Sequence, residues 1–388
     1  MVNENVFSER YVTPEINAIF STRGKILDER NFWILVMKLQ KILGQPFSSE
    51  DIEKYEQAKE DINLKLIKKI ERGGQHDVKA RIEAFVQAAG AKEIIHVGMT
   101  SRDLTDNVEQ WEYKRASEII LGRYVAVLKH MVGRANDYRD IYLTGRTHHQ
   151  AAETTLLGRR MAMWAEELRF HIEQFEAFIP KLPLRGIKGP IGTQADMRSI
   201  LGSQEAVDLL ETAVAKHLGF KEILYAPGQV YPRSLDFALV SHLAFLSSAC
   251  ENYAIGMRLM AGYELVTEGF KAGQTGSTAM PHKMNTRSSE RIWAAAEALK
   301  MYADGGSRIS GATWEEGDVS DSLLRRVIGP DAFYASDTVC ETTMTVLQKM
   351  GAYPIIISQE VDRYLQFMAT PEILSTAVKA GLGREQAH

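Results

Sequence analysis

Apolar residues recur every three or four positions along several long stretches of the chain, which is the spacing of an α-helix. The longest unbroken series alternates steps of four and three and consists of Leu239, Leu243, Leu246, Cys250, Tyr253, Met257 and Met260. It predicts a helix over 234–260, and residues 237–250 within it contain no Asp, Glu, Lys or Arg. A helix without charge on any face is typical of a buried position, so we expect it in the core of a bundle.

The same spacing predicts further long helices over 106–140, 151–179 and 318–350, the last interrupted by Pro330. Proline costs about 3 kcal/mol inside a helix, and none occurs between Pro46 and Pro180. No strand-rich region, internal repeat or low-complexity tract stands out. The pattern therefore predicts an all-α fold built around a bundle of long helices.

Three regions follow from this pattern. We expect an N-terminal helical domain over 1–105, a central long-helix bundle over 106–349 and a short C-terminal helical domain over 350–388. The chain ends in GLGREQAH, within what should be a helix, so we expect the C-terminal domain to be incomplete.

The composition excludes several classes of protein. The 46 Lys and Arg residues nearly balance 50 Asp and Glu residues, so no broad basic field is available for nucleic acid. The uncharged run 237–250 is too short to cross a membrane, and the N-terminus lacks an apolar signal region. Cys250 and Cys340 cannot build a disulfide framework, which fits a reducing compartment. We therefore expect a cytoplasmic globular protein.

Common catalytic motifs are absent from the sequence. It contains no GxxxxGK[ST], HExxH, CxxC or GxSxG motif, so it offers no standard phosphate loop, zinc site or nucleophile elbow. The glycines of RGIKGPIGT follow no predicted strand, which makes dinucleotide binding a weak interpretation. No metal ion or cofactor is expected.

The segment 272–291, AGQTGSTAMPHKMNTRSSER, concentrates polar side chains in a loop before a helix. By composition alone it could equally be an ordinary polar surface loop. By pattern, residues 276–285 resemble the GSxxMPxKxN signature of the aspartase/fumarase superfamily. A match of this length is highly specific.

Other segments extend the resemblance over nearly the whole chain and narrow it to the adenylosuccinate lyase family. They are SERYVTPE, QHDVKARIEAF, HVGMTSRDLTDNVEQ, GRTHHQAAETTLLGRR, LRGIKGPIGTQADM, APGQVYPRSLD and EEGDVSDSLLRR. The resemblance implies a three-domain, mostly helical subunit. It also implies a homotetramer with shared active sites that releases fumarate from two nucleotide substrates. These are adenylosuccinate and a succinyl-carboxamide ribonucleotide, SAICAR.

The resemblance also implies the catalytic roles. Ser277 matches the general base that removes the proton next to a carboxylate, and Lys283 would stabilise the developing negative charge. His148 matches the general acid that protonates the leaving nitrogen, with Glu290 as its charged partner. His76 belongs to the family's HD pair. Without the resemblance, each would more often be a solvated or structural side chain.

Substrate-binding roles carry over in the same way, and a solvated surface position is again the alternative for each. The residues are Arg10, Tyr11, Asp77, Thr100, Ser101, Gln229, Asn285, Arg291, Ser322 and Arg326. Ser322 and Arg326 would lie at the phosphate, since arginine offers a fork of donors. His149 is given no chemistry; a metal pair with His148 is the weaker alternative.

Two positions depart from the family pattern. Gly317 and Gln75 stand where many members have arginine, which affects the expected phosphate binding more than the elimination. Two alternatives remain open. One is another fumarate-releasing lyase, such as argininosuccinate lyase or aspartase, against which the HD pair, the TSRD segment and the segment 322–326 argue. The other is a non-catalytic helical scaffold, against which the presence of both Ser277 and His148 argues.

Overall fold

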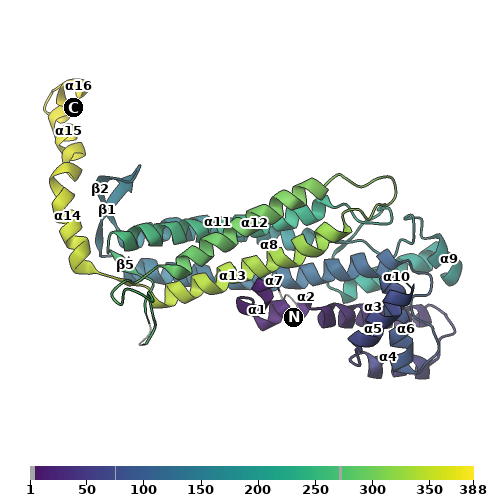
Figure 1. The fold of residues 1–388 in the computed structure, drawn as a ribbon. Coiled ribbons are helices and arrows are strands. Elements are labelled where there is room, and N and C mark those ends of the chain that lie inside the picture. The colour runs from purple at the N-terminus through teal and green to yellow at the C-terminus, as the bar shows by residue number, and fades with distance from the viewer. Residues whose placement is uncertain (1–4, 75, 271–272) are drawn as a thin grey trace. The chain divides into compact units, whose positions relative to one another are not determined.

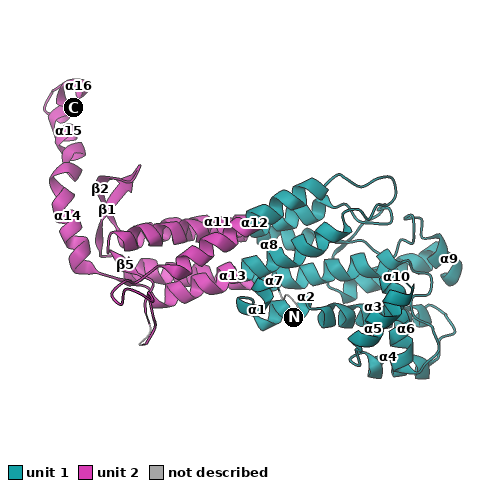
Figure 2. Ribbon diagram, in the orientation of Figure 1, with its two compact units in different colours: residues 1–121, 174–243, 299–337 teal, residues 122–173, 244–298, 338–388 magenta. Residues whose placement is uncertain are grey.

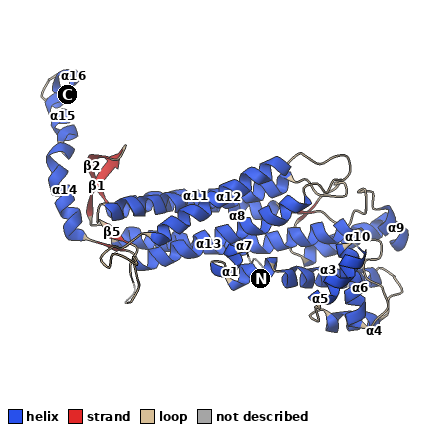
Figure 3. Ribbon diagram, viewed as in Figure 1, coloured by secondary structure: helices blue, strands red, loops and turns tan. Residues whose placement is uncertain are grey.

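The computed structural model describes residues 5–74, 76–270 and 273–388. Helices dominate this part of the chain, and the strands are few and short, so the prediction of a mostly helical fold is confirmed (Figure 3). The residues form two compact units, each assembled from three separate stretches of chain (Figure 2). Unit 1 comprises residues 1–121, 174–243 and 299–337, and unit 2 comprises 122–173, 244–298 and 338–388.

Short helices begin the chain, and polar side chains cap several of them. Ser21, Ser48 and the imidazole of His76 each accept a hydrogen bond from a backbone N–H in the first turn of the following helix. The helices are α1 (Val6–Arg10), α2 (Pro14–Phe20), α3 (Thr22–Ile42), α4 (Ser49–Ala58), α5 (Leu64–Gly74) and α6 (Asp77–Ala89).

The long helices follow the predicted pattern closely. They are α7 (Ser101–Asp137), α8 (Leu157–Phe178), α11 (Ser234–Gly262), α12 (Arg287–Ile309) and α13 (Ser322–Lys349) (Figure 1). Every residue of the seam predicted on α11 is at most 3% exposed. Pro330 lies inside α13 without ending it. Because proline has no N–H, the carbonyl of Arg326 one turn earlier loses its usual helical partner.

One prediction along these helices is wrong. Residues 151–156 were expected at the start of the helix 151–179, but they form strand β2 (Gln150–Leu156), which pairs antiparallel with β1 (Tyr142–Thr147). The first apolar residue with helical spacing is Leu157, and α8 starts there. The hairpin changes the location of His148, which lies in its turn and not directly before a helix.

The remaining elements connect the long helices and form the C-terminal segment. They are η1 (Ile179–Lys181), β3 (Pro183–Leu184), α9 (Ala195–Leu201), α10 (Gln204–His217), β4 (Glu222–Ile223), β5 (Val266–Thr267), β6 (Gly351–Ala352), α14 (Pro354–Met368), α15 (Thr370–Lys379) and α16 (Arg384–Ala387). β3 pairs parallel with β4, and β5 pairs antiparallel with β6. α14 packs against both strands of the β1–β2 hairpin.

Each unit has a packed interior of its own. In unit 1, Trp33 stacks near Phe85 and its indole N–H donates to His96 Nδ1 at 3.0 Å. In unit 2, Trp164 meets Tyr253 edge to face, and Gly256 leaves the space that the indole ring occupies. Across the described residues, no helix combines the length and apolar character needed to span a membrane. The three-domain division at 105 and 349 stays a prediction.

Candidate active site

Unit 1 contains a cleft of about 710 Å³, lined by residues from its three stretches of chain. Seven residues predicted at the substrate site line it: His76, Asp77, Thr100, Ser101, Gln229, Ser322 and Arg326. These residues come from distant parts of the sequence. Motif matching identified each of them separately, and the fold brings their side chains to one cleft. A cleft of this volume is within the usual range for small-molecule sites.

His76 and Asp77 lie at the start of α6. The Nδ1 atom of His76 accepts a hydrogen bond from the backbone N–H of Lys79 at 3.3 Å, which caps the helix. With Nδ1 accepting, the neutral imidazole carries its proton on Nε2. The ring is therefore fixed by its capping role and can present an N–H donor to a ligand.

Asp77 is held between two arginines. Its Oδ2 atom lies 3.4 Å from a guanidinium nitrogen of Arg81 and 3.4 Å from one of Arg326. Partial burial alone would raise the pKa of Asp77, but Arg81, the amide of Val78 and Arg326 outweigh it, so the pKa lies below its usual value. Asp77 is thus an anion that holds the exposed side chain of Arg326 at the cleft.

Thr100 and Ser101 are positioned by a buried ion pair. Asp103 accepts a hydrogen bond from the backbone N–H of Thr100 at 2.7 Å, and its other oxygen pairs with Arg185. The side chains of Asp103 and Arg185 are both fully buried. Arg185 also donates to the carbonyl of Gly228, next to Gln229. The RGIKGPIGT segment therefore ties the Thr100 turn to the Gln229 loop, a role that the sequence did not reveal.

Gly317 lies directly against Gln229. A Cβ atom at position 317 would come within 2.7 Å of the Gln229 Cβ and 2.8 Å of its Oε1. The backbone N–H of Gln229 donates to the carbonyl of Glu316, so the two loops are joined at this point. A side chain at 317 would therefore have to displace Gln229, which accounts for glycine where an arginine was expected.

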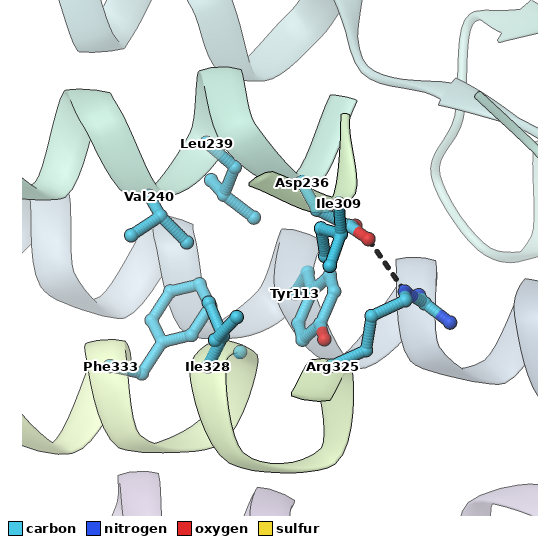
Figure 4. Close-up of a pocket in the computed structure, with 9 residues that line it drawn as sticks. Tyr113, Asp236, Leu239, Val240, Ile309, Arg325, Ile328 and Phe333 are labelled. Atoms are coloured by element: carbon cyan, nitrogen blue, oxygen red, sulfur yellow. Dashed lines mark hydrogen bonds and ion pairs between the residues drawn. The ribbon is translucent and has the colours of Figure 1, made fainter. Parts of the chain in front are cut away.

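The buried neighbour of Arg326 anchors the start of α13. Arg325 donates to Asp236 at 2.6 Å and lies 3.0 Å from Glu109, and its guanidinium also contacts Tyr231. Figure 4 shows Arg325 reaching Asp236 beside a small apolar space bounded by Tyr113, Leu239 and Phe333. Burial lowers the pKa of Arg325, but Tyr231, Asp236 and Glu109 raise it well above its usual value.

The cleft is also lined by charged side chains that the sequence analysis did not predict at the site. Lys25 lies 3.0 Å from Glu109, and Arg81 lies 2.6 Å from Glu29. Glu112 is buried beside them, and burial raises its pKa well above the usual value despite the opposing charge of Lys25. Arg81 and Glu109 lie in segments that carry the family resemblance, but the sequence analysis gave them no role. For Lys25, Glu29 and Glu112, the sequence signal is charge on the faces of helices that should pack inward.

Ser277 lies in unit 2, in the long loop between β5 and α12. Its Oγ atom accepts hydrogen bonds from the backbone N–H groups of Ala279 and Met280 at 3.4 and 3.2 Å. The Asn285 side chain donates to the carbonyl of Gly276 at 3.1 Å, so the loop closes on itself around Ser277. Lys283 is exposed on the same loop.

Glu290 and Arg291 lie in the first turn of α12. Glu268 caps this helix by accepting from the backbone N–H of Ser289 at 2.5 Å and of Ser288 at 3.1 Å. Both Glu290 and Arg291 are exposed. Within the described part of this single chain, neither a hydrogen bond nor an ion pair joins Glu290 to His148. Their pairing stays a prediction.

His148 forms the turn of the β1–β2 hairpin together with His149. Thr147 pairs with Gln150, and both histidines have left-handed backbone angles, with φ of 51° and 63°. This is the geometry of a type I′ two-residue turn. The imidazole of His148 is exposed at the tip. In unit 2, this tip and the loop that carries Ser277 extend in different directions (Figure 2).

The remaining predicted residues lie apart from the cleft. The Arg10 guanidinium stacks over the ring of Tyr11, 5.7 Å from its centroid, and neither residue lines the cleft. Gln75 falls outside the described residues. Among the residues that the structure describes, no three histidine, cysteine, aspartate or glutamate side chains cluster as metal ligands would.

Comparisons with known proteins identify the family of this chain. Residues 22–298, more than half of the chain, match a protein family described as lyase. Adenylosuccinate lyase from Saccharomyces cerevisiae is 31% identical over 98% of this chain and 80% of that protein. The chain belongs to the adenylosuccinate lyase family. The Bacillus subtilis member is 29% identical over 98% of this chain and 86% of its own length.

Solved structures confirm the fold of this family member. The 3-carboxy-cis,cis-muconate lactonizing enzyme from Pseudomonas putida superposes with a TM-score of 0.86 at 18% identity, over 99% of this chain and 86% of that one. A fumarate lyase from Mesorhizobium sp. BNC1 gives 0.82 at 18% identity, over 97% of this chain and 84% of that one. At these identities the likeness shows the fold alone.

Proposed function

We propose that this chain is an adenylosuccinate lyase, which eliminates fumarate from adenylosuccinate to give AMP and from SAICAR to give AICAR. The observation that carries the proposal is that residues assigned to the substrate site by sequence lie together in one cleft. Curated adenylosuccinate lyases match 98% of the chain, and seven residues that the motif resemblance assigned to the substrate site line one cleft. The enzyme is thus a C–N lyase acting in purine biosynthesis.

The proposed binding mode divides the substrate along the cleft of unit 1. Thr100, Ser101 and the N–H of His76 offer donors to the succinyl carboxylates, and Gln229 adds an amide contact. Ser322 and Arg326 receive the phosphate, with Arg10 and Tyr11 as further substrate contacts. The buried pairs Asp103–Arg185 and Arg325–Asp236 support this binding mode because they fix the loops and the helix start that carry these groups.

The proposed chemistry lies with residues of unit 2. Ser277 removes the proton next to the carboxylate, and the two amides that donate to its Oγ favour the deprotonated hydroxyl. Lys283 stabilises the carbanion, whose charge spreads into the carboxylate, while Asn285 and Arg291 hold the loop and the substrate. His148 then protonates the leaving nitrogen, with Glu290 supporting its charged form. The substrate carboxylate stores the charge, so the reaction needs no metal or cofactor.

We further propose that the chain acts as a homotetramer in the cytoplasm, with residues of several subunits in each site. The hairpin turn of His148 and the loop of Ser277 extend apart within one unit, which supports a site completed by another copy. Exposed apolar side chains on α11, including Phe245 and Leu259, support a surface for such a copy. The two cysteines, Cys250 and Cys340, are both buried thiols, which fits a reducing compartment.

The test is a direct absorbance assay of fumarate release from adenylosuccinate, SAICAR, argininosuccinate and aspartate. We expect release from the first two substrates. Release from argininosuccinate or aspartate alone would favour the other superfamily lyases. No release from any of them, by a folded protein, would favour a non-catalytic scaffold.

A further inference from the structure

The turn that carries His148 is built in a costly backbone conformation. Two successive non-glycine residues, His148 and His149, have positive φ. Such residues cost free energy and persist only where their surroundings hold them. The pairing of β1 with β2 shifts in register between Thr144 and Arg146. The hydrogen-bond ladder of the hairpin is therefore irregular close to the turn. Contacts with residues outside the hairpin would therefore stabilise this turn.

Arg146 makes that outside connection. Its Nη1 atom donates to the carbonyl of His149 at 3.1 Å, inside the turn. Its Nη2 atom donates to Glu360 Oε1 at 2.6 Å, on α14. Only 15% of the Arg146 side chain and 11% of the Glu360 side chain are exposed, so water competes little for this pair.

Two aromatic rings complete the surroundings of Arg146. Its guanidinium carbon lies 4.5 Å from the ring centroid of Tyr263, which follows α11, and 5.3 Å from that of Tyr364, one turn beyond Glu360 on α14. Both distances are within the range of a cation–π contact. The guanidinium is thus held by two rings and a carboxylate at once. We call Arg146, Tyr263, Glu360 and Tyr364 the α14 clamp.

A second arginine reaches the same region. Arg160 on α8 donates to the carbonyl of Thr144 in β1 at 3.1 Å. Burial lowers the pKa of Arg160, and the charge of Glu360 acts in the opposite direction, so Glu360 lies within electrostatic reach of it. The Oε2 atom of Glu360 is buried and accepts no hydrogen bond from the described residues. Glu360 therefore places a buried carboxylate within reach of both Arg146 and Arg160.

We propose that Glu360, acting through Arg146, is a positioning residue for His148, so that the C-terminal helix α14 sets the orientation of the general acid. This inference rests on the proposed role of His148 in the elimination. Glu360 acts only through the Arg146 side chain and the carbonyl of His149. The clamp holds the hairpin turn and thereby the exposed imidazole at its tip. Its loss should slow the chemical step while leaving the binding groups of the unit 1 cleft in place.

The test compares Arg146→Ala, Glu360→Ala and the double variant, assayed as full-length protein with adenylosuccinate. A misplacement of about 1 Å costs up to about 100-fold in rate, so we expect kcat to fall by about 10- to 100-fold while KM changes by less than about threefold. Arg146 and Glu360 act through the same contact. The kcat of the double variant should therefore be no lower than that of either single variant. Glu360→Gln, which keeps an acceptor for Arg146, should be affected less.

Two further measurements separate positioning from mere anchoring. Guanidinium ion at about 20 mM, well below denaturing concentration, should restore part of the kcat of Arg146→Ala by filling the vacated position between Glu360 and the rings. Hydrogen exchange of peptides within 142–156 should rise in both alanine variants. The matched control is Arg169→Ala, which removes an exposed ion pair with Glu173 on α8 and should leave kcat unchanged.

The outcomes distinguish the two proposals. Wild-type kcat in both alanine variants, with a lowered Tm alone, would show that the pair only anchors α14 and would overturn the clamp. A raised KM at unchanged kcat would place Arg146 at the substrate and would also overturn it. Absence of fumarate release by the wild-type chain would instead overturn the proposed function. The positioning role of Glu360 would then be overturned as well, because it rests on the role of His148.

Discussion

Single residues in the candidate site differ in how far the sequence could identify them. Ser277 and His148 are accessible and lie in motifs, so pattern matching finds them. Asp103 and Arg185, which hold the Thr100 turn, are fully buried and meet across 82 positions of the chain. No local pattern reports such a pair, because its partners are adjacent only after folding. The sequence could therefore identify candidate reacting groups more readily than the buried groups that orient their surroundings.

Ser277→Ala should lower kcat by about 10²–10⁴-fold, which is the usual cost of losing a general base, with little change in substrate affinity. The physical reason is that the variant lacks the hydroxyl that accepts from the amides of Ala279 and Met280. Single-turnover assays and a binding titration would measure the two effects. The control is Ser307→Ala on α12, whose hydroxyl only donates to the carbonyl of Asp304. A variant with more than about a tenth of wild-type turnover would remove Ser277 from this role.

Arg326→Ala should raise KM strongly for both substrates, because position 317 supplies no arginine and the proposed binding mode assigns the phosphate to Arg326. Steady-state kinetics would show a change in KM that exceeds the change in kcat. Arg308→Ala, which removes another exposed arginine with an aspartate partner, should leave KM unaltered. An unaffected KM in Arg326→Ala would mean that the phosphate binds elsewhere.

Glu112→Gln should stabilise the protein at neutral pH and have little effect in acid. Burial raises the folded pKa of Glu112 above its unfolded value, so the protonated form favours folding. That contribution is fully present below the unfolded pKa, about 4.3, and is lost as pH rises toward the folded value. Tm measured from pH 4 to pH 8 should therefore diverge in favour of the variant. Equal Tm values across this range would contradict a raised pKa.

Among the elements, the sequence was reliable for long helices and failed at the hairpin. The apolar seam of α11 predicted burial at every position because its spacing is set by helix geometry. The turn of the β1–β2 hairpin lacks the Asn-Gly or Asp-Gly pair that usually marks a type I′ turn, and two histidines take its place. Local propensity cannot predict a turn that contacts with α14 hold in place. His148, the proposed general acid, lies in this turn.

The start of α12 offers a prediction at the same scale. Glu268→Ala should destabilise the protein by about 1 kcal/mol, because removing a helix cap leaves the N–H groups of Ser288 and Ser289 without their acceptor. Activity should fall as well, since this turn carries Glu290 and Arg291. Denaturant unfolding would measure the first effect, and Glu176→Ala, exposed on α8, serves as the control. Unchanged stability would mean that another group caps α12.

For the whole molecule, the predicted residues fall into two sets. Seven predicted residues line the cleft of unit 1, whereas His148 and the loop that carries Ser277 and Asn285 belong to unit 2. The sequence could predict membership of each set through the resemblance. The resemblance already implied shared sites, but the sequence did not predict the β1–β2 hairpin, which extends away from the loop that carries Ser277. Their separation is the physical motive for a test of shared sites.

Two inactive variants should rescue each other if each site draws His148 and Ser277 from different chains. Ser277→Ala and His148→Gln would be denatured together in equal amounts, refolded and assayed for fumarate release. Random mixing in a symmetric oligomer then leaves about a quarter of sites with both residues intact. If both residues came from one chain, every site would carry one lesion and mixing would restore nothing. The control refolds each variant alone, and mass-tagged subunits verify that mixed oligomers form. Background activity in verified mixed oligomers would contradict shared sites and require the hairpin tip and the Ser277 loop of one chain to meet when substrate binds.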